Sequence, residues 1–233
     1  MTVLVASPRV LQHLPAGTLM PGSVSLVATA LNGELPGAAT VHDVDLELVT
    51  GRLTVVTAAE ERTSRTLLRL LSSACSLTSG QLVYRDRHGS TDLAQACARD
   101  VVAVRRRGIV CSVTLRPPHP ALSCAHAVAE LAHRTVDEAA SELAALGHGH
   151  AVDLRVGDTR GSDRSVLPIA AALLHPAPVV LVDLTNHTTD EVRDRLVARA
   201  RRGGAVLAVT DSLVDGLPAS ARTRLLTAEG RLL

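Results

Sequence analysis

The sequence lacks lysine and is almost free of aromatic side chains. Phe and Trp are absent, Tyr84 is the one aromatic residue, and all 24 residues of the Lys and Arg class are Arg. A chain without aromatics has no platform on which the bases of a single-stranded nucleic acid can stack. The formal net charge of +1 gives no electrostatic footprint for nucleic acid or for an anionic membrane. We therefore predict no nucleic-acid partner.

Cysteine is also scarce, and long apolar runs are missing. The four cysteines are Cys75, Cys97, Cys111 and Cys124. Their wide, irregular spacing contains no C-x-x-C pair and matches neither a zinc pattern nor a dense disulfide framework. No apolar run approaches the roughly 18 residues that a membrane span needs, so we expect no direct membrane insertion. Pro8 and Arg9 interrupt any signal-peptide core, which favours a cytoplasmic location.

The chain is rich in aliphatic residues. Apolar residues make up 46% of its 233 residues, carried by Ala, Val and Leu, and mean hydropathy is +0.23. This composition supports one domain with a sizeable aliphatic core. Prolines and glycines punctuate residues 1–22, which predicts a weakly structured leader before a domain over residues 23–233.

Hydrophobic periodicity predicts antiparallel strands first and strand–helix alternation afterwards. Strands are predicted at 23–31, 44–49, 53–57, 81–84, 109–113, 178–182, 205–210 and 222–226. Helices are predicted at 63–73, 123–133, 135–146, 163–175 and 189–202. The order indicates an α/β protein with a mostly parallel core sheet, an antiparallel β part and a helical insertion at about 115–165.

Four separated strings carry a resemblance to a known family. They are VHDVDLELVTGRLTVV, LLRLLSSACSLTSGQLVY, AALLHPAPVVLVD and GGAVLAVTDSL, and they occur in the family's order with plausible spacing. In order and content they resemble the ATP-binding domain of ABC transporters, over residues 23–233. The resemblance implies the P-loop NTPase-like ABC ATPase fold, with ATP and Mg²⁺ as the family's cofactors.

The residues at the family's phosphate loop differ from its G-x-x-x-x-G-K-[ST] motif. That motif uses glycines to turn backbone N–H groups toward phosphate, and a lysine that reaches the β- and γ-phosphates. By position, Ala58 and Thr63 replace the two glycines, Ser64 replaces the lysine, and Arg65 replaces the Mg²⁺-binding hydroxyl. Thr66 agrees with the residue that usually follows. The resemblance makes Ser64, Arg65 and Thr66 the positional equivalents of the nucleotide-binding residues.

Two glutamates change the charge of this loop. Glu60 and Glu61 place negative charge where an anion would dock, and such carboxylates suit a helix N-terminus themselves. The loop is therefore interpreted as a capped helix start. Arg62 or Arg65 could attract phosphate, but the preferred interpretation is an Arg paired with a neighbouring Glu.

At the positions of the family's remaining motifs, this chain retains two aspartates. Asp183 matches the Walker B aspartate and is the candidate Mg²⁺ ligand, and Asp190 matches the D-loop aspartate. Thr114 stands at the Q-loop glutamine, Leu184 at the catalytic glutamate, and Asp211 at the switch histidine. The alternatives are structural: Asp183 as a cap of backbone N–H groups, and Asp190 as an acid at a helix start.

Two further features complete the candidate sites. The family's signature motif falls at residues 159–163, so that Arg160, Gly161 and Ser162 are the signature equivalents and one glycine is kept. The string His148-Gly149-His150 could bind a metal, but no third ligand is near in the sequence, and a turn is the preferred interpretation.

Together these residues predict a degenerate ABC-type protein. Losing one group that stabilises charge in the transition state costs a factor of about 10² or more in rate, so efficient ATP hydrolysis is not expected. The prediction is a scaffold or regulatory partner of a membrane-spanning transporter subunit, of a second ATP-binding domain, or of both. Such a protein would be peripheral on the cytoplasmic face, with the membrane subunit in a groove at about 114–132. The alternatives are an active ATP-hydrolysing subunit with atypical motifs, and a relic without a partner.

Overall fold

The structure is a computed structural model that describes residues 24–35, 39–185, 187–212 and 214–233. The predicted leader at residues 1–22 lies outside the described residues. So do residues 36–38, shortly before the second strand.

Two sheets form the frame of the molecule. One is a four-stranded antiparallel sheet with the order β2-β1-β4-β5, and the other is a five-stranded parallel sheet with the order β6-β7-β8-β3-β9. The antiparallel strands are β1 (Ser25–Glu34), β2 (Thr40–Val49), β4 (Ser79–Asp86) and β5 (Gly89–Asp92). The parallel strands are β3 (Leu53–Ala58), β6 (Ile109–Cys111), β7 (Val179–Asp183), β8 (Ala205–Thr210) and β9 (Arg222–Leu226).

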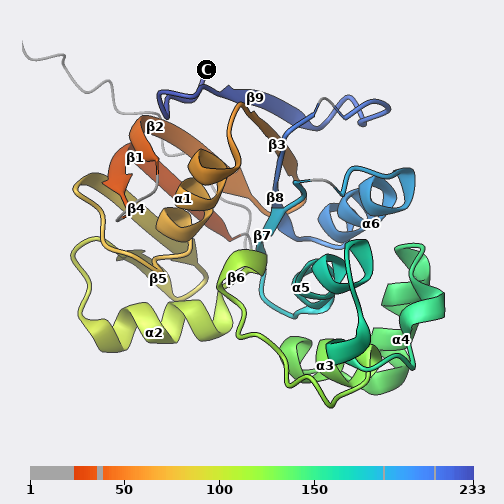
Figure 1. The fold of residues 1–233 in the computed structure, drawn as a ribbon. Coiled ribbons are helices and arrows are strands. Elements are labelled where there is room, and N and C mark those ends of the chain that lie inside the picture. The colour runs from red at the N-terminus through yellow and green to blue at the C-terminus, as the bar shows by residue number, and fades with distance from the viewer. Residues whose placement is uncertain (1–23, 36–38, 186, 213) are drawn as a thin grey trace, which may run out of the picture.

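Helices cover both faces of the parallel sheet (Figure 1). They are α1 (Glu61–Leu71), α2 (Ala98–Arg107), α3 (Cys124–Ala132), α4 (Val136–Ala145), α5 (Ser162–Leu174) and α6 (Asp190–Arg201). Three short 3₁₀ turns connect them: η1 (Ser112–Thr114), η2 (Gly149–Ala151) and η3 (Val156–Asp158). In Figure 1, α3, α4 and α5 gather at the lower right, and the antiparallel sheet lies at the left.

The parallel sheet separates two apolar cores. Side chains alternate along β7, so Val180 and Val182 pack with helices α3 to α6, whereas Val179 and Leu181 pack with α1 and the antiparallel sheet. Helix α1 contacts β1 and β2 of one sheet and β3 and β7 of the other. Burial on both faces explains why β7 and β8 are continuous apolar runs in the sequence.

The structure confirms the predicted fold class, with a parallel sheet, an antiparallel sheet and a group of helices between β6 and β7. The capping box before α4 is also confirmed, because Thr135 Oγ1 accepts from the Glu138 N–H and Glu138 accepts from the Thr135 N–H. Gly147 follows α4 with a φ of +84°, in the left-handed region that favours glycine. Pro168 lies within α5, and the helix continues through it.

Two elements were not predicted. Strand β5 is short and polar, and its residues are exposed or half-buried, so it has no hydrophobic alternation. Helix α2 buries only Val104 and is otherwise dominated by arginines, so its apolar stripe is too narrow to stand out. Across the described helices, none combines the length and the hydropathy that a transmembrane segment needs.

Candidate functional site

The carboxyl edge of the parallel sheet brings the candidate residues together. Asp183 ends β7, and α1 begins directly after β3, which is separated from β7 by β8. Because parallel strands end at the same edge, the start of α1 and Asp183 face each other there. This edge is where open α/β sheets bind ligands.

The segment at the family's phosphate loop is a regular helix start. Helix α1 begins at Glu61, the Ala59 N–H donates to the Leu226 carbonyl (3.0 Å), and the Ser64 N–H donates to the Glu60 carbonyl (3.1 Å). Within the described stretch 58–66, no residue has a positive φ. A phosphate nest needs successive N–H groups turned toward one point, which this backbone does not provide.

The hydroxyl groups of the loop turn back onto the helix. Ser64 and Thr66 are buried, and their side-chain hydroxyls donate to the carbonyls of Glu61 (2.8 Å) and Arg62 (2.9 Å). Such bonds to the preceding turn satisfy a hydroxyl without any ligand. The two positional equivalents therefore lie inside the protein.

Arg65 lies between two carboxylates. Its Nη2 is 2.7 Å from Glu61 Oε1, and its Nε is 3.4 Å from Asp183 Oδ2. The Arg65 side chain is 55% exposed and that of Asp183 only 10%. The predicted pairing of Arg65 with a neighbouring glutamate is confirmed. The contact with Asp183, which is 118 positions away, was not predicted.

Asp183 has partners on both carboxylate oxygens. Its Oδ1 accepts from the Thr185 N–H (3.1 Å) and from the Thr185 hydroxyl (2.6 Å), while Oδ2 faces Arg65. Its own N–H donates to Ser112 Oγ (2.9 Å). The structural alternative for Asp183, a cap of a nearby backbone N–H, is confirmed. Its role as a metal ligand stays a prediction.

The residues at the other catalytic positions differ in their surroundings. Leu184 is 1% exposed and packs in the core beneath α5 and α6, with its N–H donating to the Val209 carbonyl (2.7 Å). Thr114 is half-buried at the end of η1 and donates its hydroxyl to the Cys111 carbonyl. Asp211 is exposed directly after β8. Leu184 therefore serves packing at the position of the catalytic glutamate.

The signature equivalents form the turn that starts α5. Gly161 precedes α5 with φ +55° and ψ −131°, a conformation that favours glycine, and Arg160 and Ser162 are exposed. Asp190 is the first residue of α6 and pairs with Arg193 (2.6 Å), while Thr189 is the N-cap. The alternative for Asp190, an acid in the first turn of a helix, is confirmed.

A cavity of about 540 Å³ lies next to the predicted groove. It is bordered by Thr114 and Leu115 after β6, by Leu131 and His133 at the end of α3, and by His175 after α5. Arg105 and Arg106 of α2 form a basic side of this cavity. Residues from both ends of the predicted range 114–132 therefore line this cavity.

Solved structures similar to this chain include ATP-binding cassettes of ABC transporters. The dimeric bacterial ABC transporter cassette MJ0796 matches with a TM-score of 0.68 and 14% identity, over 89% of this chain and 96% of that one. A nucleotide-free ATP-binding cassette from an ABC transporter matches with a TM-score of 0.62 and 12% identity, over 90% of each chain. The chain has the fold of an ABC transporter ATP-binding cassette.

A larger protein contains the same cassette fold. The structure of a bacterial Atm1-family ABC exporter with ATP bound matches with a TM-score of 0.64 and 16% identity. The match covers 92% of this chain and 39% of the exporter chain, so the cassette fold here spans about two fifths of that protein. No protein-family model and no curated protein sequence matches the chain.

Sequence reasoning missed two partners in this edge of the cassette. Thr185, two residues after Asp183, holds Oδ1, and Arg65 reaches Oδ2 from α1. The contact with Thr185 could have been predicted from the sequence, because an Asp side chain often accepts from the backbone N–H two residues further on. The contact with Arg65 depends on β3 and β7 ending at the same edge of the parallel sheet, and the strand order that puts them there is known only from the fold.

Proposed function

We propose that this chain is an ABC cassette that does not hydrolyse ATP efficiently and acts as a scaffold or regulatory partner in a membrane transporter. The observation that carries the proposal is the ion pair of Arg65 with Glu61 and Asp183 (2.7 and 3.4 Å). At the position where the family places an Mg²⁺-binding hydroxyl, this chain holds a permanent cation on the Walker B aspartate.

The residues at this edge do not fit Mg²⁺–ATP. A single carboxylate is a poor Mg²⁺ site unless phosphate oxygens share the ion, and here Arg65 already neutralises that carboxylate. Glu60 and Glu61 add negative charge at the helix start where the β- and γ-phosphates would dock. The backbone at 58–66, which leaves β3 and enters α1 at Glu61, adds no nest of N–H groups.

Four residue types that the family uses for ATP hydrolysis are replaced in this chain. Hydrolysis by this fold depends on positioning and on charge stabilisation at the γ-phosphate, and removing one such group costs about 10² or more in rate. Ser64, Leu184, Thr114 and Asp211 stand where the family has its lysine, glutamate, glutamine and histidine. Ser64 and Leu184 are also buried, so neither side chain reaches a bound nucleotide.

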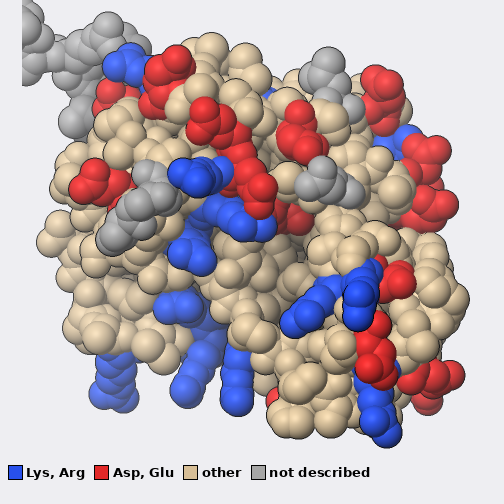
Figure 2. Space-filling model, in the orientation of Figure 1, with Lys and Arg blue, Asp and Glu red and all other residues tan. Residues whose placement is uncertain are grey.

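The partner proposal rests on the cavity beside α3. Apolar Leu115 and Leu131 line its wall, and Arg105 and Arg106 lie at its basic side. Figure 2 shows basic side chains projecting at the lower left, where Figure 1 places α2. This chemistry suits a short amphipathic segment with acidic residues, which we assign to a membrane-spanning subunit on the cytoplasmic face. A second cassette domain is the other partner, by analogy with the dimeric MJ0796.

Phosphate release from ATP tests the catalytic half of the proposal. The purified chain is expected to release phosphate no faster than Asp183→Asn, with Asp153→Asn as a matched exposed control. The rival function, an active subunit with atypical motifs, predicts turnover that Asp183→Asn abolishes and Asp153→Asn leaves unchanged. That result would overturn the proposal.

Sedimentation with native membranes tests the partner half. Arg105→Glu combined with Arg106→Glu is expected to shift the chain from the membrane fraction to the supernatant, because the basic side of the cavity is reversed. Arg201→Glu combined with Arg202→Glu, exposed at the end of α6, is the matched control. Equal sedimentation of both double variants, or a wild-type chain that never sediments, would favour the relic instead.

A further inference from the structure

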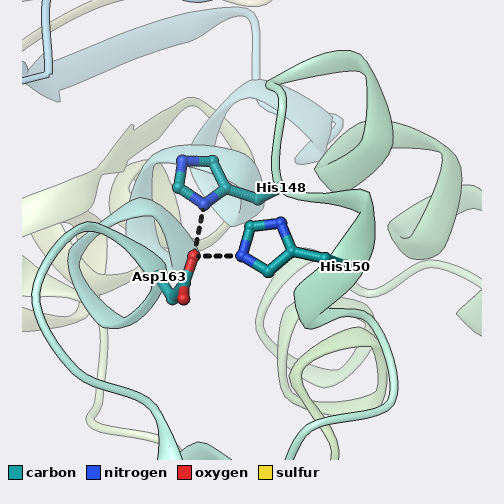
Figure 3. A group of neighbouring side chains, drawn as sticks. All are labelled: His148, His150 and Asp163. Carbon is teal, nitrogen blue, oxygen red and sulfur yellow. Dashed lines mark hydrogen bonds and ion pairs between the residues drawn. The ribbon is translucent and has the colours of Figure 1, made fainter.

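A cluster of two histidines and an aspartate lies in the helical group, between η2 and the start of α5. His148 Nδ1 is 2.7 Å and His150 Nε2 is 3.0 Å from the same oxygen, Asp163 Oδ1. One ligand atom of each residue lies within 4.8 Å of the other two. Figure 3 shows both imidazole rings directed at the Asp163 carboxylate.

The backbone holds the three residues in place from two separate elements. Gly147 ends the α4 segment, and the His148 N–H donates to the Leu143 carbonyl (2.8 Å) while its carbonyl accepts from Ala151 (3.0 Å). His150 follows in η2, and Asp163 lies in the first turn of α5. The sequence showed the two histidines but no third ligand, and the fold supplies it from 13 positions further on, at Asp163.

The donor set and the spacing match a zinc site. Imidazole nitrogen and carboxylate oxygen are ordinary zinc ligands, and zinc in proteins is mostly tetrahedral. With ligand distances of about 2.0–2.1 Å, neighbouring donor atoms of a tetrahedron lie about 3.3–3.4 Å apart. The two measured separations, 2.7 and 3.0 Å, therefore need to widen by less than about 1 Å to admit the ion.

The exposure of the cluster leaves an entry path. The side chain of His148 is 16% exposed, that of Asp163 25%, and that of His150 63%. Two of the three ligands are thus partly buried, and His150 is open to solvent.

We propose that His148 Nδ1, His150 Nε2 and the Asp163 carboxylate bind one Zn²⁺, with water as the fourth ligand on the exposed side. The ion ties η2 to the first turn of α5, immediately after the turn at Gly161. This proposal is independent of the proposed function, since neither nucleotide nor partner takes part. The neighbouring His187, whose Nε2 is hydrogen-bonded to Ser165 Oγ (2.6 Å), does not belong to this group of ligand atoms.

Calorimetric titration of the full chain with Zn²⁺, after treatment with a chelator, tests the site. The wild type is expected to bind one ion, and His150→Gln is expected to weaken binding at least about tenfold. His42→Gln is the matched control, because His42 is exposed on β2 in the antiparallel sheet. Co²⁺ in place of Zn²⁺ is expected to show the visible absorption of a tetrahedral complex, and His150→Gln to lose it.

Three results would overturn the site. They are the absence of saturable Zn²⁺ binding, equal affinity in His150→Gln and the wild type, and equal weakening by His42→Gln. Binding that persists in His150→Gln would assign the metal to other donors, such as the exposed Cys97. Asp163→Asn is a second variant, checked by circular dichroism, and retained tight binding in this folded variant would also contradict the proposal.

Discussion

Arg65 shows how one residue can set the charge at the carboxyl edge of the parallel sheet. The sequence resemblance predicts a small hydroxyl side chain at its position, whereas here a guanidinium reaches Glu61 and Asp183. The pair with Glu61 is exposed and contributes little stability, about 0–1 kcal/mol. Its importance is therefore electrostatic: it supplies a fixed positive charge at the carboxyl edge of the sheet.

His175 gives a prediction for the pH dependence of stability. Burial lowers the pKa of His175 from 6.5 to about 4, with additional effects from the charges of His133, Arg199 and Arg134. Between these two pH values the unfolded chain takes up a proton that the folded chain does not, so stability falls as the pH falls. At about 1.36 kcal/mol per pKa unit, the loss approaches about 3 kcal/mol near pH 4.

His175→Asn isolates this effect. Asparagine can still accept the hydrogen bond from the Ala177 N–H, which His175 Nδ1 accepts at 3.1 Å, but it does not titrate. Urea unfolding at pH 7 and pH 4.5 is expected to show a smaller drop for the variant than for the wild type. An equal drop in both proteins would contradict the assignment.

Helix α4 gives a prediction at the scale of an element. Its capping box joins Thr135 and Glu138 through reciprocal hydrogen bonds, and the bond from the Thr135 N–H also lowers the pKa of Glu138. Thr135→Ala is expected to lower the free energy of unfolding by about 1 kcal/mol, because it removes the acceptor for a helix N–H. Denaturant unfolding measures this loss, with Ser141→Ala on the exposed side of α4 as control. Equal effects of the two variants would contradict the role of the cap.

The elements also show what the sequence could and could not predict. Strands β7 and β8 and helix α1 were predicted, because burial requires long apolar runs or a clear apolar stripe. Helix α2 was missed because tertiary contact, through Val104, stabilises a segment that is mostly arginine and small residues. Local pattern carries little information where a helix buries only one side chain.

Some contacts of the candidate site could be predicted from the sequence, and others depend on the fold. The pair Glu61 and Arg65 follows from helical i, i+4 spacing and was predictable. The contact between Arg65 and Asp183 depends on the order of parallel strands, and the contact of His148 and His150 with Asp163 depends on how α5 packs beside η2. Contacts of that kind exist only once the topology is known.

At the scale of the whole molecule, an ion pair with a buried glutamate joins helix α4 to helix α6. Arg195 of α6 donates from Nε to Glu142 Oε1 of α4 (3.0 Å) and from Nη2 to Oε2, and Glu142 is 2% exposed. Removing one partner leaves a buried charge, so Arg195→Met is expected to cost about 3–5 kcal/mol. The double variant Glu142→Leu with Arg195→Met is expected to regain most of that loss.

A double-mutant cycle measured by urea unfolding tests this coupling. The cycle compares the wild type with the single variants Arg195→Met and Glu142→Leu and with the double variant. Additive effects, or a cost below about 1 kcal/mol for Arg195→Met, would contradict this coupling between α4 and α6.

Calorimetric titration of the wild-type chain with Mg²⁺–ATP tests the central claim most directly. The ion pair at Asp183 and the helical phosphate-loop segment predict no saturable binding tighter than about 1 mM, equivalent to about −4.1 kcal/mol. Saturable micromolar binding that Asp183→Asn abolishes would contradict the account, because Asp183 would then be a working ligand of the metal-bound nucleotide.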